Sequence, residues 1–280
     1  MRPMTAPLRR VLVRRPGGLE RWRELGWRAE PDAGRVEAEH EALRAALAGA
    51  GAEVVLAEPL DGNPDAVYVF DPALVSRRGA ILLRPGKQGR REEPDGLGRD
   101  LEAAGIPILG RLQAPACAEG GDLVWLDEHT LAVGLGYRTN EAGAAALAEA
   151  LPDVDVLAFD LPHFRGPADV LHLMSMLSPL DADLALVHLP LMPTRLVQTL
   201  RERGVTFVEI DEKEYGTLAC NVLALAPRRV LAFDGNPGTR RRLESAGVEV
   251  RVVDGRELGL KGDGGPTCLT QPLHRDFGPL

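Results

Sequence analysis

The chain alternates short apolar segments with longer segments in which apolar residues recur at helical spacing. Twelve apolar segments have the length of a strand, and Gly, Pro or Asp bounds nearly every one, which is typical of strands joined by turns. These segments are residues 9–16, 51–58, 79–86, 106–112, 121–127, 130–136, 155–162, 183–190, 205–210, 221–227, 228–235 and 248–255. We predict a strand within each of them.

Four longer segments predict amphipathic helices, because each has a capping or turn residue before it and Gly or Pro at its end. They lie within residues 35–51, 139–152, 189–204 and 236–247. The order helix, glycine, strand recurs about every 40 to 60 residues, which indicates internal repeats around a common centre. This alternation predicts an α/β fold. No G-x-G-x-x-G or P-loop follows a strand, which argues against the usual nucleotide-binding sites.

Composition narrows the class of protein further. The 280 residues, 45% of them hydrophobic, are expected to form one domain over residues 1–280. Lys and Arg number 33 against 41 Asp and Glu, a net charge of −8 that argues against nucleic acid as a partner. No apolar run approaches the roughly 20 residues that span a bilayer. No apolar signal region follows the N-terminal charges, so we expect a cytoplasmic protein with no membrane partner.

The cysteines are few, and one of them stands in an unusual setting. Cys117, Cys220 and Cys268 are too widely spaced to indicate a disulfide framework or a zinc site. Cys268 follows the run KGDGGP, whose glycines allow the backbone to come close to a ligand. A thiol with its ordinary pKa of about 8.5 needs a cationic or hydrogen-bonding neighbour to act as a nucleophile. A buried structural cysteine is the alternative, but the glycines and the flanking Thr267 and Thr270 favour catalysis.

A cysteine nucleophile needs an acid–base partner, and histidine is the first choice at neutral pH. Of the six histidines, His163 and His172 lie in the segments best suited to this role. His172 has apolar residues on both sides, where an unpaired imidazole would be unfavourable to bury. We therefore favour His172.

Two acidic motifs are candidates for orienting a histidine or binding a cation. Glu119 and Asp122 flank a diglycine at the start of a predicted strand, in the sequence AEGGDLVWL. An acidic hairpin turn explains that motif equally well. Asp65 and Asp71 lie on either side of a short apolar stretch, predicted as a strand, in GNPDAVYVFDPALV. Turn chemistry next to proline is the alternative there.

Arginines in two glycine-containing connections are candidates for binding an anionic group. The connections are RPGKQGRREEP and GLGYRTN, and they contain Arg84, Arg90, Arg91 and Arg138. Arginine binds carboxylates through two parallel hydrogen bonds. A solvated surface arginine is the alternative at each position.

In this order, the motifs resemble the guanidino-modifying, or pentein, superfamily, which contains dimethylarginine dimethylaminohydrolases, arginine deiminases and amidinotransferases. The resemblance covers nearly the whole chain. It is carried by VLVRRP, NPDAVYVFDPALV, RPGKQGRR, EGGDLVWL, GLGYRTN, VLHLMSM and GPTCLT. It implies a five-bladed α/β propeller of ββαβ repeats, with pseudo-fivefold symmetry around a central channel that holds the active site.

The same resemblance implies the catalytic residues of a single catalytic domain. Cys268 attacks the guanidinium carbon and forms a covalent thiouronium intermediate. His172 protonates the departing amine and then activates water, and Glu119 orients His172. The reaction is hydrolysis of a guanidino C–N bond in arginine or an N-methylated arginine, which gives citrulline and ammonia or an amine.

The resemblance also implies how the small guanidino substrate is bound. Asp71 and Asp65 pair with the guanidinium nitrogens, while Arg90 and Arg138 bind the substrate carboxylate. The mechanism needs no cofactor, and no metal-ligand cluster is evident in the sequence. The sequence leaves open whether the protein is a homodimer.

Two positions depart from the family pattern and leave the substrate open. Deiminases and amidinotransferases have His-x-Asp where this chain has His172 and Met174, so Met174 favours the dimethylarginine branch. That branch usually has Glu-Asp where this chain has Phe70 and Asp71. The alternatives are an arginine deiminase or amidinotransferase acting on another guanidine, and a non-catalytic propeller that only binds. Because Cys268, His172 and Glu119 are all present, the sequence argues against the last alternative.

Overall fold

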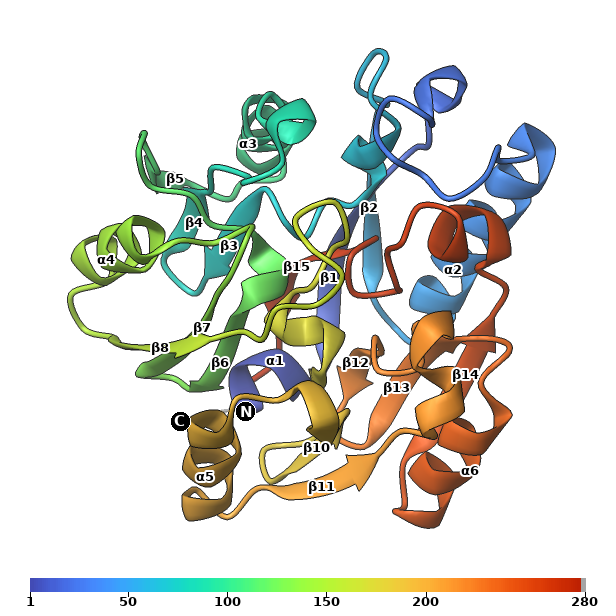
Figure 1. Ribbon diagram of the computed structural model, residues 1–280. Coiled ribbons are helices and arrows are strands. Elements are labelled where there is room, and N and C mark those ends of the chain that lie inside the picture. Colours follow the sequence, from blue (N-terminus) through green and yellow to red (C-terminus); the bar gives the residue numbers. More distant parts are fainter. Residues whose placement is uncertain (278–280) are drawn as a thin grey trace.

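The computed structural model describes residues 1–277 of the 280-residue chain. Its strands form five separate sheets of three strands each (Figure 1). The strands are β1 (Leu8–Arg14), β2 (Glu53–Ala57), β3 (Ala73–Ser76), β4 (Gly79–Leu82), β5 (Ile108–Arg111), β6 (Leu123–Asp127), β7 (Thr130–Leu135), β8 (Asp155–Asp160), β9 (Leu177–Pro179), β10 (Leu184–Val187), β11 (Thr206–Glu209), β12 (Leu223–Ala226), β13 (Arg229–Phe233), β14 (Glu249–Val253) and β15 (Gln271–Arg275).

Every sheet follows one pattern. The middle strand has an antiparallel neighbour on one side and a parallel neighbour on the other. The sheet orders are β15-β1-β2, β3-β4-β5, β6-β7-β8, β9-β10-β11 and β12-β13-β14. A parallel neighbour needs a crossover connection, and in each sheet a helix provides it. The α/β prediction is therefore confirmed, as five small mixed sheets.

Among residues 1–277, five of the six α-helices lie at the outside of the molecule, beyond the sheets, and the short N-terminal one lies further in, against β6 and β12 (Figure 1). They are α1 (Arg2–Thr5), α2 (Ala33–Gly49), α3 (Glu93–Ala103), α4 (Glu141–Ala150), α5 (Thr194–Glu202) and α6 (Pro237–Ser245). The longest, α2, begins at the cap residue Asp32, whose side chain accepts a hydrogen bond from the Arg35 backbone N–H at 3.0 Å. Its inner face buries Leu43 and Leu47, and each such leucine contributes roughly 1.5–3 kcal/mol of apolar burial. Among the described residues, no helix is both long and apolar enough to cross a bilayer.

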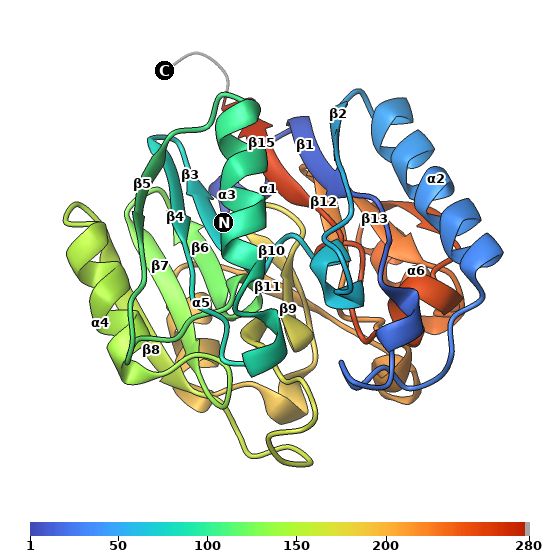
Figure 2. The same ribbon diagram turned by 90° about the horizontal axis from the view of Figure 1, so that it is seen from above.

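Three strands and one helix were missed, and one predicted strand is a turn instead. Strands β3 and β9 lie outside the twelve predicted segments. The last strand was missed, because PLHRD reads as an exposed end; β15 instead pairs with β1 from the other end of the chain (Figure 2). Helix α3 was missed because Pro94, Gly96 and Gly98 weaken its helical pattern. The apolar stretch after Asp65 was expected to be a strand, but Pro64–Val67 form a 3-10 turn. The four helices that were predicted are all present.

In every sheet, one polar residue lies in the segment just before the outer strand that pairs antiparallel with the middle strand. Asp71 precedes β3, Glu119 precedes β6, and His172 precedes β9. Asn221 precedes β12, and Cys268 precedes β15. Loops that lead into equivalent strands of a rigid scaffold are common positions for functional side chains. The contacts among these five residues are described below.

Candidate active site

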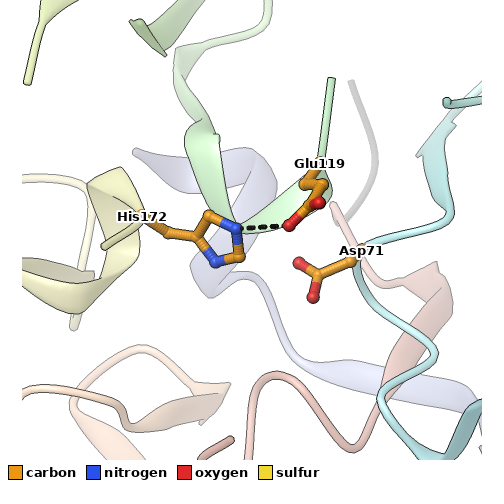
Figure 3. Close-up of side chains that lie close together, drawn as sticks. All are labelled: Asp71, Glu119 and His172. Carbon is orange, nitrogen blue, oxygen red and sulfur yellow. Dashed lines mark hydrogen bonds and ion pairs between the residues drawn. The ribbon is translucent and has the colours of Figure 1, made fainter. Parts of the chain in front are cut away.

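The imidazole of His172 is hydrogen-bonded to the carboxylate of Glu119. Nε2 of His172 lies 2.7 Å from Oε2 of Glu119, and both side chains are buried (Figure 3). Glu119 leads into the 3-10 turn Gly120–Asp122, and His172 leads into the 3-10 turn Leu173–Ser175. Asp122 joins the two turns, because its Oδ1 accepts a hydrogen bond from the Leu173 backbone N–H at 2.9 Å. The Thr139 hydroxyl donates to the other oxygen of Asp122 at 2.6 Å.

The diglycine between Glu119 and Asp122 is required because the His172 ring and the Phe70 backbone lie very close to it. A Cβ atom on Gly121 would lie 2.3 Å from Nδ1 of His172, and one on Gly120 would lie 2.2 Å from a backbone oxygen of Phe70. Both distances are far inside van der Waals contact. Any side chain at either position would displace the imidazole or the neighbouring backbone, so these glycines position the site and do more than form a turn.

Asp71 completes a compact group with Glu119 and His172. One ligand atom from each of the three lies within 4.8 Å of the others, and Figure 3 shows the three side chains facing one another. The Gly121 backbone N–H donates to Oδ1 of Asp71 at 2.9 Å. The guanidinium of Arg90 donates to Oδ2 of Asp71 at 2.6 Å. Asp71 is thus held in one orientation by two donors on different segments.

Arg90 and Arg138 lie behind this group and stabilise its carboxylates. Arg90 is buried, and besides Asp71 it contacts both oxygens of Glu93 and the backbone oxygen of Tyr68. Arg138 is also buried and donates to Oε2 of Glu119 at 3.2 Å. Their predicted role was to bind a substrate carboxylate. The structure gives both arginines protein carboxylates as partners, and neither lines the pocket described below.

Asp65 is also engaged within the protein. Its Oδ1 accepts a hydrogen bond from Nε1 of Trp27 at 2.7 Å, and its Oδ2 forms an ion pair with the ammonium of Lys87. The same ammonium contacts the backbone oxygen of Leu25. The backbone N–H of Lys87 donates to Oε1 of Glu119 at 3.1 Å. Asp65 was predicted to pair with the substrate, but in the structure its charge is balanced by Lys87, a residue that the sequence analysis did not single out.

Cys268 and His172 line the same pocket, which has a volume of about 80 Å³. Cys268 is half-buried, and its Sγ accepts a hydrogen bond from the side-chain amide of Asn221 at 3.2 Å. The Asn221 side chain packs directly against Gly265, where a Cβ atom would lie 2.3 Å from it. Asn221 was missed because it stands at the start of the strongly apolar segment NVLALAP, which predicts only a strand.

The wall of this pocket contains both positions that depart from the family pattern. Phe70 and Met174 line it, and so does Cys220. The Cys220 side chain is buried, and burial raises the pKa of its thiol far above the ordinary range. A buried thiol of this kind is typical of a structural cysteine.

The charges of the group shift two pKa values in opposite directions. Burial by itself would lower the pKa of His172, but Asp122, Asp71 and Glu119 outweigh it and raise that pKa to about 9. Although burial opposes the ionised form of Glu119, the hydrogen bond from His172 lowers the pKa of this carboxyl well below its usual range. At neutral pH the pair is an imidazolium and a carboxylate.

The pKa of the Cys268 thiol is raised, which disfavours the thiolate that a nucleophile needs. Burial, followed by the negative charge of Asp71, raises its pKa to about 12. The hydrogen bond from Asn221, the one from the Gly265 backbone and the positive charge of Arg90 act in the other direction but do not cancel these effects. The thiol is thus protonated at neutral pH unless a cation enters the pocket beside it.

The group of Asp71, Glu119 and His172 is also the set of described side chains with the spacing of a metal site. Its charges do not fit one. A metal ligand must be a neutral imidazole, and the pKa of His172 is raised to about 9. The carboxylates already have cationic partners in Arg90 and Arg138. The arrangement is better suited to hold and transfer a proton than to coordinate an ion.

Comparison with known proteins agrees with this chemistry. A sequence model of the arginine deiminase family matches residues 104–205 and 191–275. An arginine deiminase of Mycobacterium marinum is 34% identical over 194 residues, which are 58% of this chain and 47% of that protein. This chain thus spans about half the length of the mycobacterial arginine deiminases it matches. A dimethylarginine dimethylaminohydrolase of Streptomyces coelicolor is 30% identical over 272 residues, 95% of this chain and 98% of that one.

Solved structures give the same picture. The dimethylarginine dimethylaminohydrolase of Pseudomonas aeruginosa, in a cysteine-to-serine mutant complexed with citrulline, has 26% sequence identity and a TM-score of 0.79. The alignment covers 94% of this chain and 98% of that one. Another structure, of a dimethylarginine dimethylaminohydrolase adduct with 4-chloro-2-hydroxymethylpyridine, is 27% identical with a TM-score of 0.77. That alignment covers 94% of this chain and 98% of the other. The N-terminal domain of a cyanobacterial arginine dihydrolase shares the fold at 22% identity, with a TM-score of 0.84 over 98% and 100%.

Proposed function

This chain belongs to the arginine deiminase family, and on that basis we propose that it is a cysteine hydrolase of guanidino C–N bonds. The observation that carries the proposal is the shared pocket: Cys268 and His172 both line it, and His172 is held by Glu119. We propose that Cys268 is the nucleophile, His172 the acid and base, and Glu119 the residue that orients His172. The five sheets would then be the blades of a propeller around a central active site.

The raised pKa of the Cys268 thiol determines how the reaction begins. A guanidinium that enters the pocket brings a positive charge next to the sulfur, which stabilises the thiolate relative to the thiol. The thiol proton leaves to solvent and Sγ adds to the guanidinium carbon, giving a tetrahedral adduct. Asp71 is held by Gly121 and Arg90, and its negative charge acts on Cys268; it is the proposed partner of the guanidinium nitrogens.

His172 is proposed to act twice. Its Nε2 is bonded to Glu119, which leaves Nδ1 to exchange a proton with the reacting groups. The imidazolium gives its proton to the departing nitrogen, the C–N bond breaks, and a thiouronium remains on Cys268. The neutral imidazole then takes a proton from water, the hydroxide adds to the thiouronium carbon, and collapse releases a ureido product and the thiolate.

The wall of the pocket bears on the substrate. Phe70 and Met174 are apolar side chains beside Cys268, and apolar groups suit a guanidino nitrogen that carries methyl groups. We propose arginine or an N-methylated arginine as the substrate, with citrulline and ammonia or an amine as products. These substrates are those expected of the two enzyme types that the chain resembles, arginine deiminases and dimethylarginine dimethylaminohydrolases. Of the two substrates, the apolar wall favours an N-methylated arginine, and the likeness to arginine deiminases favours unsubstituted arginine.

A colorimetric assay for ureido product tests the proposal. Arginine, mono- and dimethylarginines, agmatine and other guanidines are incubated with the wild-type protein, the Cys268→Ser variant and the Cys220→Ser variant. We expect ureido product from at least one of the arginines with wild type and Cys220→Ser, and none with Cys268→Ser. Turnover by Cys268→Ser at the wild-type rate would exclude the covalent mechanism. Absence of ureido product from every guanidine would favour a non-catalytic binding protein.

A further inference from the structure

A second cavity, larger than the catalytic pocket, lies on the other side of a shared wall. It has a volume of about 400 Å³, within the range of small-molecule sites. Phe70, Met174 and Thr267 line both this cavity and the catalytic pocket. The other lining residues come mainly from α1, the β3–β4 hairpin, β6 and β15. We refer to this space as the β15 cavity.

The β15 cavity contains a buried guanidinium that has no carboxylate partner among residues 1–277. Arg275 is 7% exposed, and its NH1 donates to the backbone oxygen of Ala6 at 2.7 Å. Within residues 1–277, no carboxylate lies within ion-pair distance of it. Burial lowers the pKa of Arg275 to about 9, so the group is still a cation at neutral pH. A buried charge without a counter-charge is unfavourable, and an anion at this place would compensate it.

The other charges around the cavity do not supply that anion. Arg77 pairs with Glu128 at 3.5 Å, and Arg78 pairs with Asp153 at 3.6 Å. All four of these residues line the cavity, and they balance one another in pairs. The positive charge of Arg275 is therefore left over.

A second polar group in the cavity lacks a partner. Gln271 is 2% exposed, and its side-chain oxygen has no hydrogen-bond partner among the described residues. Gln271, Leu273 and Arg275 alternate with more exposed residues along β15, so their side chains share one face of the strand. Gln271 is nearest in sequence to Cys268, and Leu273 is an apolar residue between the two polar ones. Four strand residues span roughly 13 Å between the two Cα atoms.

From this arrangement we propose that the β15 cavity binds an elongated, largely apolar monocarboxylate with a hydrogen-bond donor at its far end. The carboxylate pairs with Arg275, the apolar body packs along Leu273, and the donor bonds the oxygen of Gln271. The ligand lies against Phe70, Met174 and Thr267 from the side opposite the catalytic pocket. It is not the guanidino substrate, because the cavity presents an unpaired cation and no unpaired carboxylate to it.

Binding by a matched series of probes tests the proposal on the wild-type protein. ω-Hydroxyalkanoic acids from hexanoic to decanoic length carry both ends, plain alkanoates lack the donor, and the corresponding diols lack the carboxylate. Titration calorimetry is expected to show one hydroxyacid bound per chain, and about tenfold weaker binding of both the alkanoate and the diol of the same length. Equal affinity for the three probes, or no binding of any of them, would overturn the proposal.

Substitutions locate the site. Gln271→Leu is expected to give the hydroxyacid and the alkanoate equal affinity, and Arg275→Gln to remove the preference for a carboxylate. Arg9→Gln, a change at an exposed arginine on β1, is the control and is expected to bind like wild type. Wild-type affinity in both Gln271→Leu and Arg275→Gln would overturn the proposal even if a probe binds.

Alkylation of Cys268 separates the two pockets. A protein labelled at Cys268 is expected to bind the hydroxyacid with unchanged affinity, because Cys268 does not line the β15 cavity. Loss of binding after labelling would place the probe in the catalytic pocket and contradict the proposal. None of these measurements uses turnover, so their outcome is independent of whether the proposed hydrolase activity is found.

Discussion

Nε2 of His172 and Oε2 of Glu119 are 2.7 Å apart in a buried site, although 53 residues separate them in the chain. The hydrogen bond orients the imidazole, and Asp122, Asp71 and Glu119 together hold a proton on the ring at neutral pH. Both properties are needed if His172 is first an acid and then a base.

Glu119→Gln is expected to lower the pKa of His172 from about 9 toward its ordinary value, because one of the three carboxylates that favour the imidazolium is removed while Asp122 and Asp71 remain. The acid form then disappears at lower pH. The alkaline limb of the kcat profile should move down by about one pH unit or more, and kcat should fall about a hundredfold or more. Glu92→Gln, at an exposed glutamate, is the matched control. An unchanged alkaline limb in Glu119→Gln would mean that the pair does not set the protonation of His172.

The Cys268 thiol should react slowly with a neutral alkylating agent at pH 7. Its pKa is raised to about 12, so the thiolate fraction grows about tenfold for each pH unit below that value. Iodoacetamide labelling at Cys268, followed by mass spectrometry from pH 7 to 10, should show a rate that rises throughout. Asn221→Ala should slow labelling further, because it removes a donor that favours the thiolate. A rate that levels off near pH 8 would indicate an ordinary thiol.

Met174→Asp is expected to shift preference toward unsubstituted arginine. The side chain lines the catalytic pocket, and a carboxylate there gains hydrogen bonds from N–H groups that a dimethylated nitrogen lacks. The ratio of kcat/KM for arginine to that for asymmetric dimethylarginine should rise about tenfold. Met174→Leu keeps an apolar wall and should preserve the wild-type ratio. A similar change in both variants would point to altered packing and not to charge.

His172 should stabilise the folded protein at neutral pH and lose this contribution at alkaline pH. Its pKa is raised from 6.5 in the unfolded chain to about 9 in the folded protein. The contribution is fully present below pH 6.5 and is lost as the pH rises through 9. Urea unfolding at pH 6 and pH 10 should therefore show a smaller difference in free energy of unfolding between wild type and His172→Gln at pH 10. An equal difference at both values would contradict the raised pKa.

Much of the fold was accessible from local sequence patterns, and the exceptions have physical causes. Helix α4 was indicated by its cap Asn140, which accepts a hydrogen bond from the Gly143 backbone N–H at 2.8 Å, and by Pro152 after its end. Strand pairing was less accessible, because β15 is stabilised by β1 from the far end of the chain. A short strand that contains Pro, His and Arg carries no apolar alternation that would indicate it.

The candidate site was accessible in its residue types but not in its partners. Cys268, His172 and Glu119 could be singled out because each occupies a local context that is unusual for its chemistry. The bond between Arg90 and Asp71 depends on how two loops pack, which no local pattern reports. The same is true of the ion pair between the Lys87 ammonium and Asp65. The roles of Asp65, Asp71, Arg90 and Arg138 in binding a substrate stay predictions.

The most direct test of the central claim is to identify the sulfur atom that attacks a planar cationic carbon. Chloroacetamidine resembles a guanidinium in charge and shape, and its site of attachment can be mapped by peptide mass spectrometry after reaction at pH 7. The account predicts a single label on Cys268, formed faster than by iodoacetamide, slowed by arginine and its methylated forms, and absent in Cys268→Ser. Labelling of Cys220 or Cys117 with Cys268 left free would contradict it.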